Sequence, residues 1–264
     1  MKKKIKKKID FQSLRRFNLV MGCLHFIQGG LMLFFALSVT KITNFKIPLM
    51  TYFLTFDKRS VQLVTDPKMI GQVPFAIFVS LFLFISAAAH FLIVLPKLND
   101  IYNNDLKKRI NRFRWYEYAL SSSLMIVLIA MLFGMYDLGS LIILFLLNAS
   151  MNLFGLLMEL LNQYTKKTNW LPFIFGSISG LGTWVVIFIY ALGNSDPSEV
   201  PWFVYAILAS YFVFFNLFPI NMVLQYKRIG KWSNYIYGER TYILLSLIAK
   251  TVLAWLVFSG VMQP

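Results

Sequence analysis

The sequence predicts an all-α membrane protein, a single seven-helix bundle that occupies the whole chain, residues 1–264. Hydrophobic residues make up 58% of the chain and charged residues only 14%, a composition that excludes a water-soluble domain. Seven apolar stretches of about 20 residues are each long enough to cross the hydrocarbon of a bilayer, and they leave little room for a second domain. The predicted spans are residues 17–39, 73–95, 113–136, 140–163, 170–192, 201–225 and 239–261.

The basic residues predict the orientation of this multi-pass integral membrane protein. Of the 26 Lys and Arg residues, 20 lie on the same side of the spans as the N-terminus and five lie on the other side. The positive-inside rule therefore places the N-terminus in the cytoplasm and the C-terminus outside. The net charge of +15 indicates contact with anionic lipid headgroups and not with nucleic acid, because the charges flank apolar spans.

The start of the chain resembles the basic region of a signal peptide. The apolar span behind it is about 23 residues long, however, and no small-residue cleavage site follows. We therefore expect a first helix that is retained. The single cysteine, Cys23, lies inside this span, so no intramolecular disulfide can form.

Only one connection on the outside, roughly residues 40–72, is long. Apolar residues such as Tyr52, Leu54 and Phe56 are mixed there with polar neighbours, which predicts a short β-hairpin in the first extracellular loop. Such a flap would cap the bundle or contact a second protomer.

Lys250 is the exceptional residue of the last span. It lies 11 residues after Glu239, about 16 Å along a helix, and insertion of a lysine at this depth costs about 2.5–3.5 kcal/mol. One explanation is a side chain that reaches the interface. The other is a desolvated amine that is nucleophilic enough to form a Schiff base with an aldehyde.

Glu117 in the third span is the carboxylate that could pair with Lys250. It lies three residues after Arg114 and four before Ser121, so these three side chains share one helix face. A carboxylate inside a membrane needs a cationic or hydrogen-bonding partner. The alternative partner is Arg114 at the interface, because Glu117 is expected only about one turn inside the membrane.

Other polar residues gather in the cytoplasmic half of the predicted bundle. His25 in the first span and His90 in the second both fall there, and Ser86 shares a face with His90. Imidazole is suited to transient proton acceptance, so these residues are a candidate proton-accepting cluster; the alternative is that the histidines only hydrogen-bond neighbouring helices. Glu159 and Glu239 are expected near the cytoplasmic ends of their spans.

The sequence does not predict an enzyme or a metal site. It contains no HExxH motif, no cysteine–histidine cluster, no phosphate-binding glycine loop and no serine nucleophile with a nearby base. The functional interpretation therefore depends on the intramembrane polar residues.

Three motifs resemble those of microbial-type rhodopsins, and their departures point to the heliorhodopsin branch. The motifs are Ser246-Leu-Ile-Ala-Lys250, Arg114-Trp115-x-Glu117-Tyr118 and Phe215-x-x-Phe218-Pro219. The departures are the cytoplasmic N-terminus, the glutamate in the third helix, and Ser246 in place of a second acid. The resemblance implies all-trans retinal bound covalently to Lys250, Glu117 as its counterion, and a pocket that includes Ser246, Tyr118, Ser121, Ser122, Phe215, Phe218 and Pro219.

The resemblance also implies a light sensor with a long photocycle, a homodimer, and no ion pumping. The residues agree that outward proton pumping is not expected, because Ser246 is neutral and Leu128 stands where outward pumps keep a carboxylic donor. Two alternatives stay open. One is a light-gated proton channel or transporter that uses His25, His90, Glu159 and Glu239 as a relay. The other is a regulator whose basic cytoplasmic loops bind a soluble partner when illuminated.

Overall fold

The computed structural model describes residues 11–193 and 200–262, so the predicted basic run at the start of the chain lies outside the described residues. In the described ranges seven helices are long and apolar enough to cross a membrane, which confirms the predicted seven-helix bundle. They are α1 (Phe11–Ser38), α3 (Phe75–Val94), α5 (Arg112–Leu132), α6 (Leu138–Leu161), α7 (Leu171–Leu192), α8 (Trp202–Tyr226) and α9 (Tyr235–Val261).

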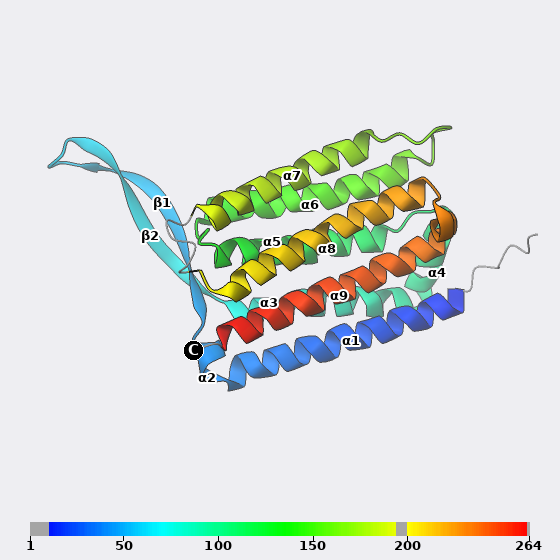
Figure 1. Cartoon of the computed structure of the whole chain (residues 1–264), viewed down its shortest axis with the longest axis horizontal. Coiled ribbons are helices and arrows are strands. Elements are labelled where there is room, and N and C mark those ends of the chain that lie inside the picture. Colours follow the sequence, from blue (N-terminus) through cyan, green and yellow to red (C-terminus); the bar gives the residue numbers. More distant parts are fainter. Residues whose placement is uncertain (1–10, 194–199, 263–264) are drawn as a thin grey trace, which may run out of the picture.

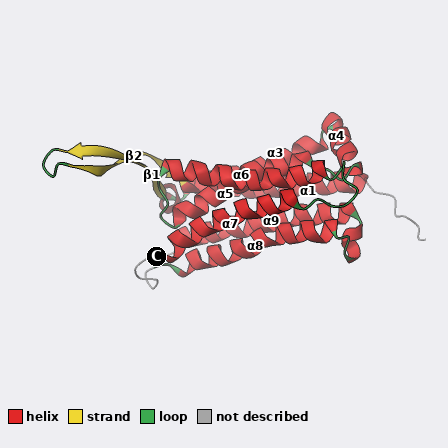
Figure 2. Ribbon diagram, turned by 90° about the horizontal axis from the view of Figure 1, so that it is seen from above, coloured by secondary structure: helices red, strands yellow, loops and turns green. Residues whose placement is uncertain are grey.

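The seven helices run side by side along the long axis of the molecule, and different elements cover the two ends (Figures 1 and 2). A β-hairpin projects from one end, and the short helix α4 (Pro96–Lys107) lies at the other. We call these the hairpin end and the α4 end. Helices α1, α3, α5, α6 and α7 pack against one another in chain order, while α8 packs on α9 and α9 packs on α1.

Local capping explains why two helix boundaries differ from the prediction. The third predicted span extends to residue 136, but α5 ends at Leu132 because Gly134 adopts a positive φ of 94°, a conformation that terminates helices. The last predicted span begins at residue 239, but α9 begins four residues earlier. The side chain of Asn234 caps it there by accepting a hydrogen bond from the Ile236 backbone N–H at 3.1 Å.

Helix α4 is a feature that was not predicted from the sequence, because only the apolar spans and the first outside connection were assigned elements. Pro96 occupies its first turn, where the missing N–H of proline costs nothing. Tyr102 and Leu106 are buried on one face, while Lys97 and Lys107 lie on the exposed surface. Two further short elements, α2 (Thr40–Thr43) and the 3-10 turn η2 (Gly230–Ser233), lie in connections.

The predicted hairpin is present and is longer than expected. Strands β1 (Lys46–Asp57) and β2 (Gln62–Pro74) pair antiparallel from Lys46 opposite Pro74 to Asp57 opposite Gln62. A register shift falls between Leu49 and Met50. The Met50 N–H donates to the carbonyl of Tyr136 at 2.9 Å, which attaches the base of the hairpin to the α5–α6 connection.

The interior of the bundle divides into an apolar half and a polar half. The largest cluster of buried apolar side chains lies toward the hairpin end and includes Phe82, Ile126, Ile129, Ile187 and Phe258. Most buried charged and polar side chains lie toward the α4 end instead. They include Asn18, His25, Ser86, Asn111, Arg114, Glu117, Glu159, Glu239, Ser246 and Lys250.

Candidate functional site

Three helices bring Lys250, Glu117 and Ser86 into direct contact. Lys250 Nζ on α9 lies 2.6 Å from Glu117 Oε1 on α5 and 2.5 Å from Ser86 Oγ on α3. Ser86 in turn donates to Glu117 Oε1 at 2.6 Å. Lys250 is only 3% exposed and Glu117 9%, so each charge compensates the other where water cannot.

The direction of the side chains explains how Glu117 meets a lysine that lies deeper along its helix. Arg114 pairs with Glu239 and Glu117 pairs with Lys250. Between the first pair and the second, α5 advances three residues, from Arg114 to Glu117, whereas α9 advances eleven, from Glu239 to Lys250. This mismatch corresponds to about 12 Å along the helix axes. Long helical side chains point back toward the helix N-terminus. Since α5 and α9 both begin at the α4 end, Arg114 and Lys250 both reach in that direction and close the difference.

An apolar cavity of about 620 Å³ borders Lys250, within the range of about 300–1,000 Å³ that holds small organic ligands. Its walls come from α5 to α9 and include most of the predicted pocket residues. Tyr118, Ser122, Phe215, Phe218, Pro219 and Ser246 all line it. Its size and apolar aromatic walls fit an elongated polyene, and the amine of Lys250 on its wall fits covalent attachment.

The positions of Tyr118 and Ser122 are fixed by hydrogen bonds. The Tyr118 hydroxyl donates to the carbonyl of Tyr242 at 3.0 Å, and its ring meets that of Phe218 edge to face with centroids 5.3 Å apart. Ser122 Oγ accepts hydrogen bonds from the amides of Asn148 at 2.9 Å and Asn152 at 3.0 Å. Ser121 is fully buried but is not among the residues that line the cavity.

The two histidines form a pair beside the lysine cluster. The rings of His25 and His90 are stacked with centroids 5.6 Å apart, and His90 Nδ1 lies 2.9 Å from Asn18 Oδ1. Ser86, which the sequence placed with His90, is bound to Lys250 and Glu117 instead. Among residues 11–193 and 200–262, no three His, Cys, Asp or Glu side chains gather as a metal ion would require.

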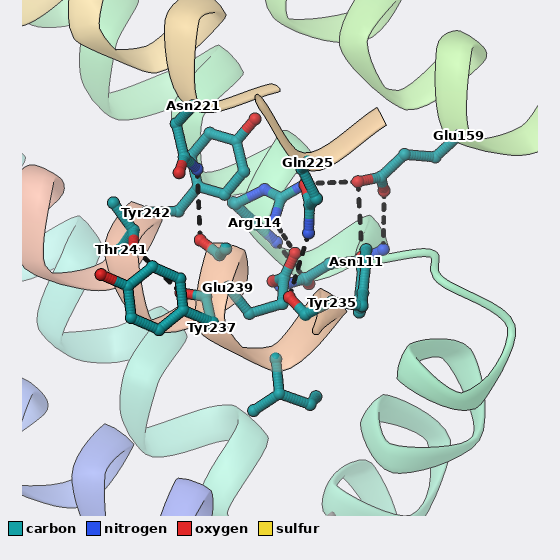
Figure 3. Close-up of polar contacts among 12 residues, drawn as sticks. Asn111, Arg114, Glu159, Asn221, Gln225, Tyr235, Tyr237, Glu239, Thr241 and Tyr242 are labelled. Carbon is teal, nitrogen blue, oxygen red and sulfur yellow. Dashed lines mark hydrogen bonds and ion pairs between the residues drawn. The ribbon is translucent and has the colours of Figure 1, made fainter. Parts of the chain in front are cut away.

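A second polar cluster lies near the α4 end, where Arg114 is enclosed by two glutamates (Figure 3). Arg114 Nη2 donates to Glu159 at 2.5 Å, and Nη1 donates to Glu239. Its guanidinium also lies over the rings of Trp115 and Tyr242, 4.6 and 4.0 Å from their centroids. Arg114 therefore forms no ion pair with Glu117, which was the alternative considered for that carboxylate.

Asn111 completes this cluster, and the sequence reasoning did not single it out. Its backbone N–H donates to Glu159 Oε2 and its side-chain amide to Glu239 Oε2, both at 2.8 Å. Its side-chain oxygen also caps α5 by accepting from the Arg114 backbone N–H at 3.0 Å. An asparagine directly before a helix is a capping signal, which could have identified the residue but not its glutamate partners.

A small cavity of about 40 Å³ separates the two clusters. Its walls include Glu117 from the lysine cluster, Asn111 and Arg114 from the second cluster, and His90 and Asn18 from the histidine side. A water needs about 10–15 Å³ of such space and several polar partners. The cavity therefore has room for a few waters between the clusters.

A membrane-spanning seven-helix bundle whose interior lysine borders an apolar cavity has the architecture of the rhodopsin class of retinal proteins. The sequence model described as Heliorhodopsin matches residues 14–262, so the chain belongs to the heliorhodopsin family. This family comprises retinal-binding, rhodopsin-like photoreceptors. No curated protein matches the chain.

The glycines near and far from the cavity allow a matched test of packing. A Cβ added at Gly155 on α6 would lie 2.3 Å from the Trp115 ring, whereas one added at Gly30 on α1 meets nothing within 4 Å. Gly155→Ala should therefore displace Trp115 and destabilise the protein by about 1–3 kcal/mol. Gly30→Ala should be neutral or stabilising by up to about 1 kcal/mol. Thermal unfolding of both variants checks this expectation, and equal midpoints would contradict it.

Proposed function

We propose that this chain is a light sensor that binds all-trans retinal covalently as a protonated Schiff base on Lys250, with Glu117 as the counterion. The observation that carries the proposal is the contact of Lys250 Nζ with Glu117 and Ser86 at the wall of the apolar cavity. We further propose a long photocycle without ion pumping, a homodimer, and a cytoplasmic α4 end, which places the N-terminus in the cytoplasm and the hairpin outside.

Each group around Lys250 has a distinct part in this proposal. Lys250 would hold retinal covalently through its primary amine, the group that condenses with an aldehyde to form an imine while the aldehyde oxygen leaves as water. Retinal, when bound, supplies the absorption of visible light and the isomerisation. The buried carboxylate of Glu117 stabilises the positive charge that remains at the nitrogen, and Ser86 orients that carboxylate through its hydrogen bond. The aromatic rings of Phe215 and Phe218 exclude water from the chain of the chromophore.

The distribution of polar groups supports a sensor over an ion pump. Toward the hairpin end the described side chains beyond Lys250 are mostly apolar, with Met125, Ile129 and Val257 buried there. Ser246, one turn before Lys250, is neutral and lines both cavities. The titratable groups beside Lys250 include Glu117, His25 and His90, and we propose that the two histidines receive a proton that leaves Lys250.

One observation favours a second candidate, a light-gated proton channel. The histidine pair, the small cavity and the Arg114 cluster form a polar path between Lys250 and the α4 end. This path is half of what a channel across the membrane would need. A channel would also need a conducting path through the apolar half when illuminated. Photocurrents decide between the two functions because a sensor moves no net charge across the membrane.

The test is to express the full chain with all-trans retinal and to record its visible spectrum and its photocurrents under voltage clamp. We expect a visible band, no steady photocurrent, and altered kinetics of deprotonation in His25→Ala and His90→Ala. Cys23→Ser is the matched control because this exposed residue lies on the same helix as His25. Absence of a visible band would refute the proposed function, and steady photocurrents would establish the channel. Unchanged kinetics in both histidine variants would remove the histidines from the mechanism.

A further inference from the structure

The Arg114 cluster contains more negative charge than positive charge. It consists of one guanidinium and two carboxylates, and Glu159 and Glu239 are 1% and 0% exposed. Arg114 is the one cation that forms an ion pair with either carboxylate within residues 11–193 and 200–262. A second ionised carboxylate without a cationic partner is strongly disfavoured at such a buried position, and a buried acid in this situation is neutralised by a proton.

The two glutamates differ in their positions relative to the dipoles of the helices that carry them. Glu239 lies just beyond the first turn of α9 (Tyr235–Val261), nearer the positive end of the helix dipole than its negative end. Glu159 lies in the last turn of α6 (Leu138–Leu161), where the partial negative charge of the dipole opposes one. The proton therefore belongs on Glu159, while Glu239 stays ionised and pairs with Arg114.

We propose that Glu159 is a neutral carboxylic acid in the resting protein, so that the Arg114 cluster is a proton-binding site separate from Lys250 and Glu117. The Tyr235 hydroxyl donates to Glu159 Oε1 at 3.4 Å, and it would rotate to accept a hydrogen bond from a protonated Glu159, because a phenol both donates and accepts. The titratable and charged groups around Glu159 come from α5, α8 and α9. They are Arg114, Tyr226, Tyr235, Glu239 and Tyr242.

The small cavity connects this site with the counterion. Arg114 and Glu117 both line it, and Arg114 Nε is buried without a hydrogen-bond partner among the described residues. A donor of this kind indicates an ordered water in the cavity. Glu159 thus lies one side chain, that of Arg114, away from a polar cavity that Glu117 also lines, so the two sites are close neighbours.

Infrared spectroscopy of the full chain in the dark tests the proposal. Solvent-exposed acids are ionised at neutral pH, so a protonated carboxyl C=O band that shifts in D₂O reports buried acids. We expect the parent to show this band and Glu159→Gln to lose it. Glu239→Gln should lose it too, because the remaining Glu159 would then ionise to balance Arg114. Asp105→Asn is the control, since Asp105 pairs with Arg112 outside the cluster, and it should keep the band.

A second pair of variants assigns the proton to one residue. Glu159→Asp should shift the frequency of the band, while Glu239→Asp should leave it nearly unchanged. A parent without the band, or a band that persists in Glu159→Gln, would overturn the proposal, and a band that follows Glu239→Asp alone would overturn the assignment to Glu159. If a glutamine variant fails to fold, the aspartate pair still decides the question. The measurement is made with and without added retinal, so its result is independent of whether the chain is a photoreceptor.

Discussion

Lys250→Ala is expected to give protein without colour after expression with all-trans retinal. The Lys250 amine lies on the wall of the apolar cavity and contacts Glu117 and Ser86, and no other lysine within residues 11–193 and 200–262 lines that cavity. Without a primary amine the covalent bond to the aldehyde cannot form. The measurement is the visible spectrum of purified protein before and after denaturation in acid, where only covalently bound retinal stays with the chain.

Lys250→Arg is the control that separates loss of attachment from loss of folding. Lys250→Ala leaves Glu117 buried without its cation, which costs about 3–5 kcal/mol. Arginine keeps a positive charge beside Glu117, yet its guanidinium forms no imine under these conditions. We therefore expect Lys250→Arg to fold better than Lys250→Ala and to be equally colourless. A variant that keeps its band after acid denaturation would show that retinal is attached elsewhere.

The sequence was sufficient for the fold because the bilayer imposes simple requirements on helix length and composition. Hydropathy located all seven spans, and the alternating loop located the hairpin. Lys250 and Glu117 were identifiable because an unpaired charge inside a membrane demands an explanation. The sequence could not predict α4, because a short helix at the end of the bundle is not apolar enough to be recognised by its hydropathy.

The pairing of buried charges was harder to predict than their presence. Arg114 lies three residues from Glu117, so local spacing left that pair open as an alternative, but Arg114 contacts Glu159 and Glu239, which are 45 and 125 residues away along the chain. Such contacts depend on which helices are neighbours and on how far each long side chain reaches along the bundle. Ser86 shows the same limit, since helical spacing grouped it with His90 while packing placed it against Lys250.

Glu117→Gln is expected either to shift the visible band to longer wavelength or to deprotonate the chromophore, which then absorbs in the near ultraviolet. A carboxylate about 4 Å from a positive charge contributes about 4 kcal/mol at an effective dielectric constant of about 20, and glutamine removes that charge while keeping the size of the side chain. The measurement is the absorption spectrum of parent and variant across neutral and mildly alkaline pH. Ser123→Ala is the control, because Ser123 is a buried neutral residue on the same helix that accepts a hydrogen bond from Asn148 and does not line the cavity. An unchanged spectrum in Glu117→Gln would assign the counterion to another acid, and Glu239 and Glu159 would be the next two to replace.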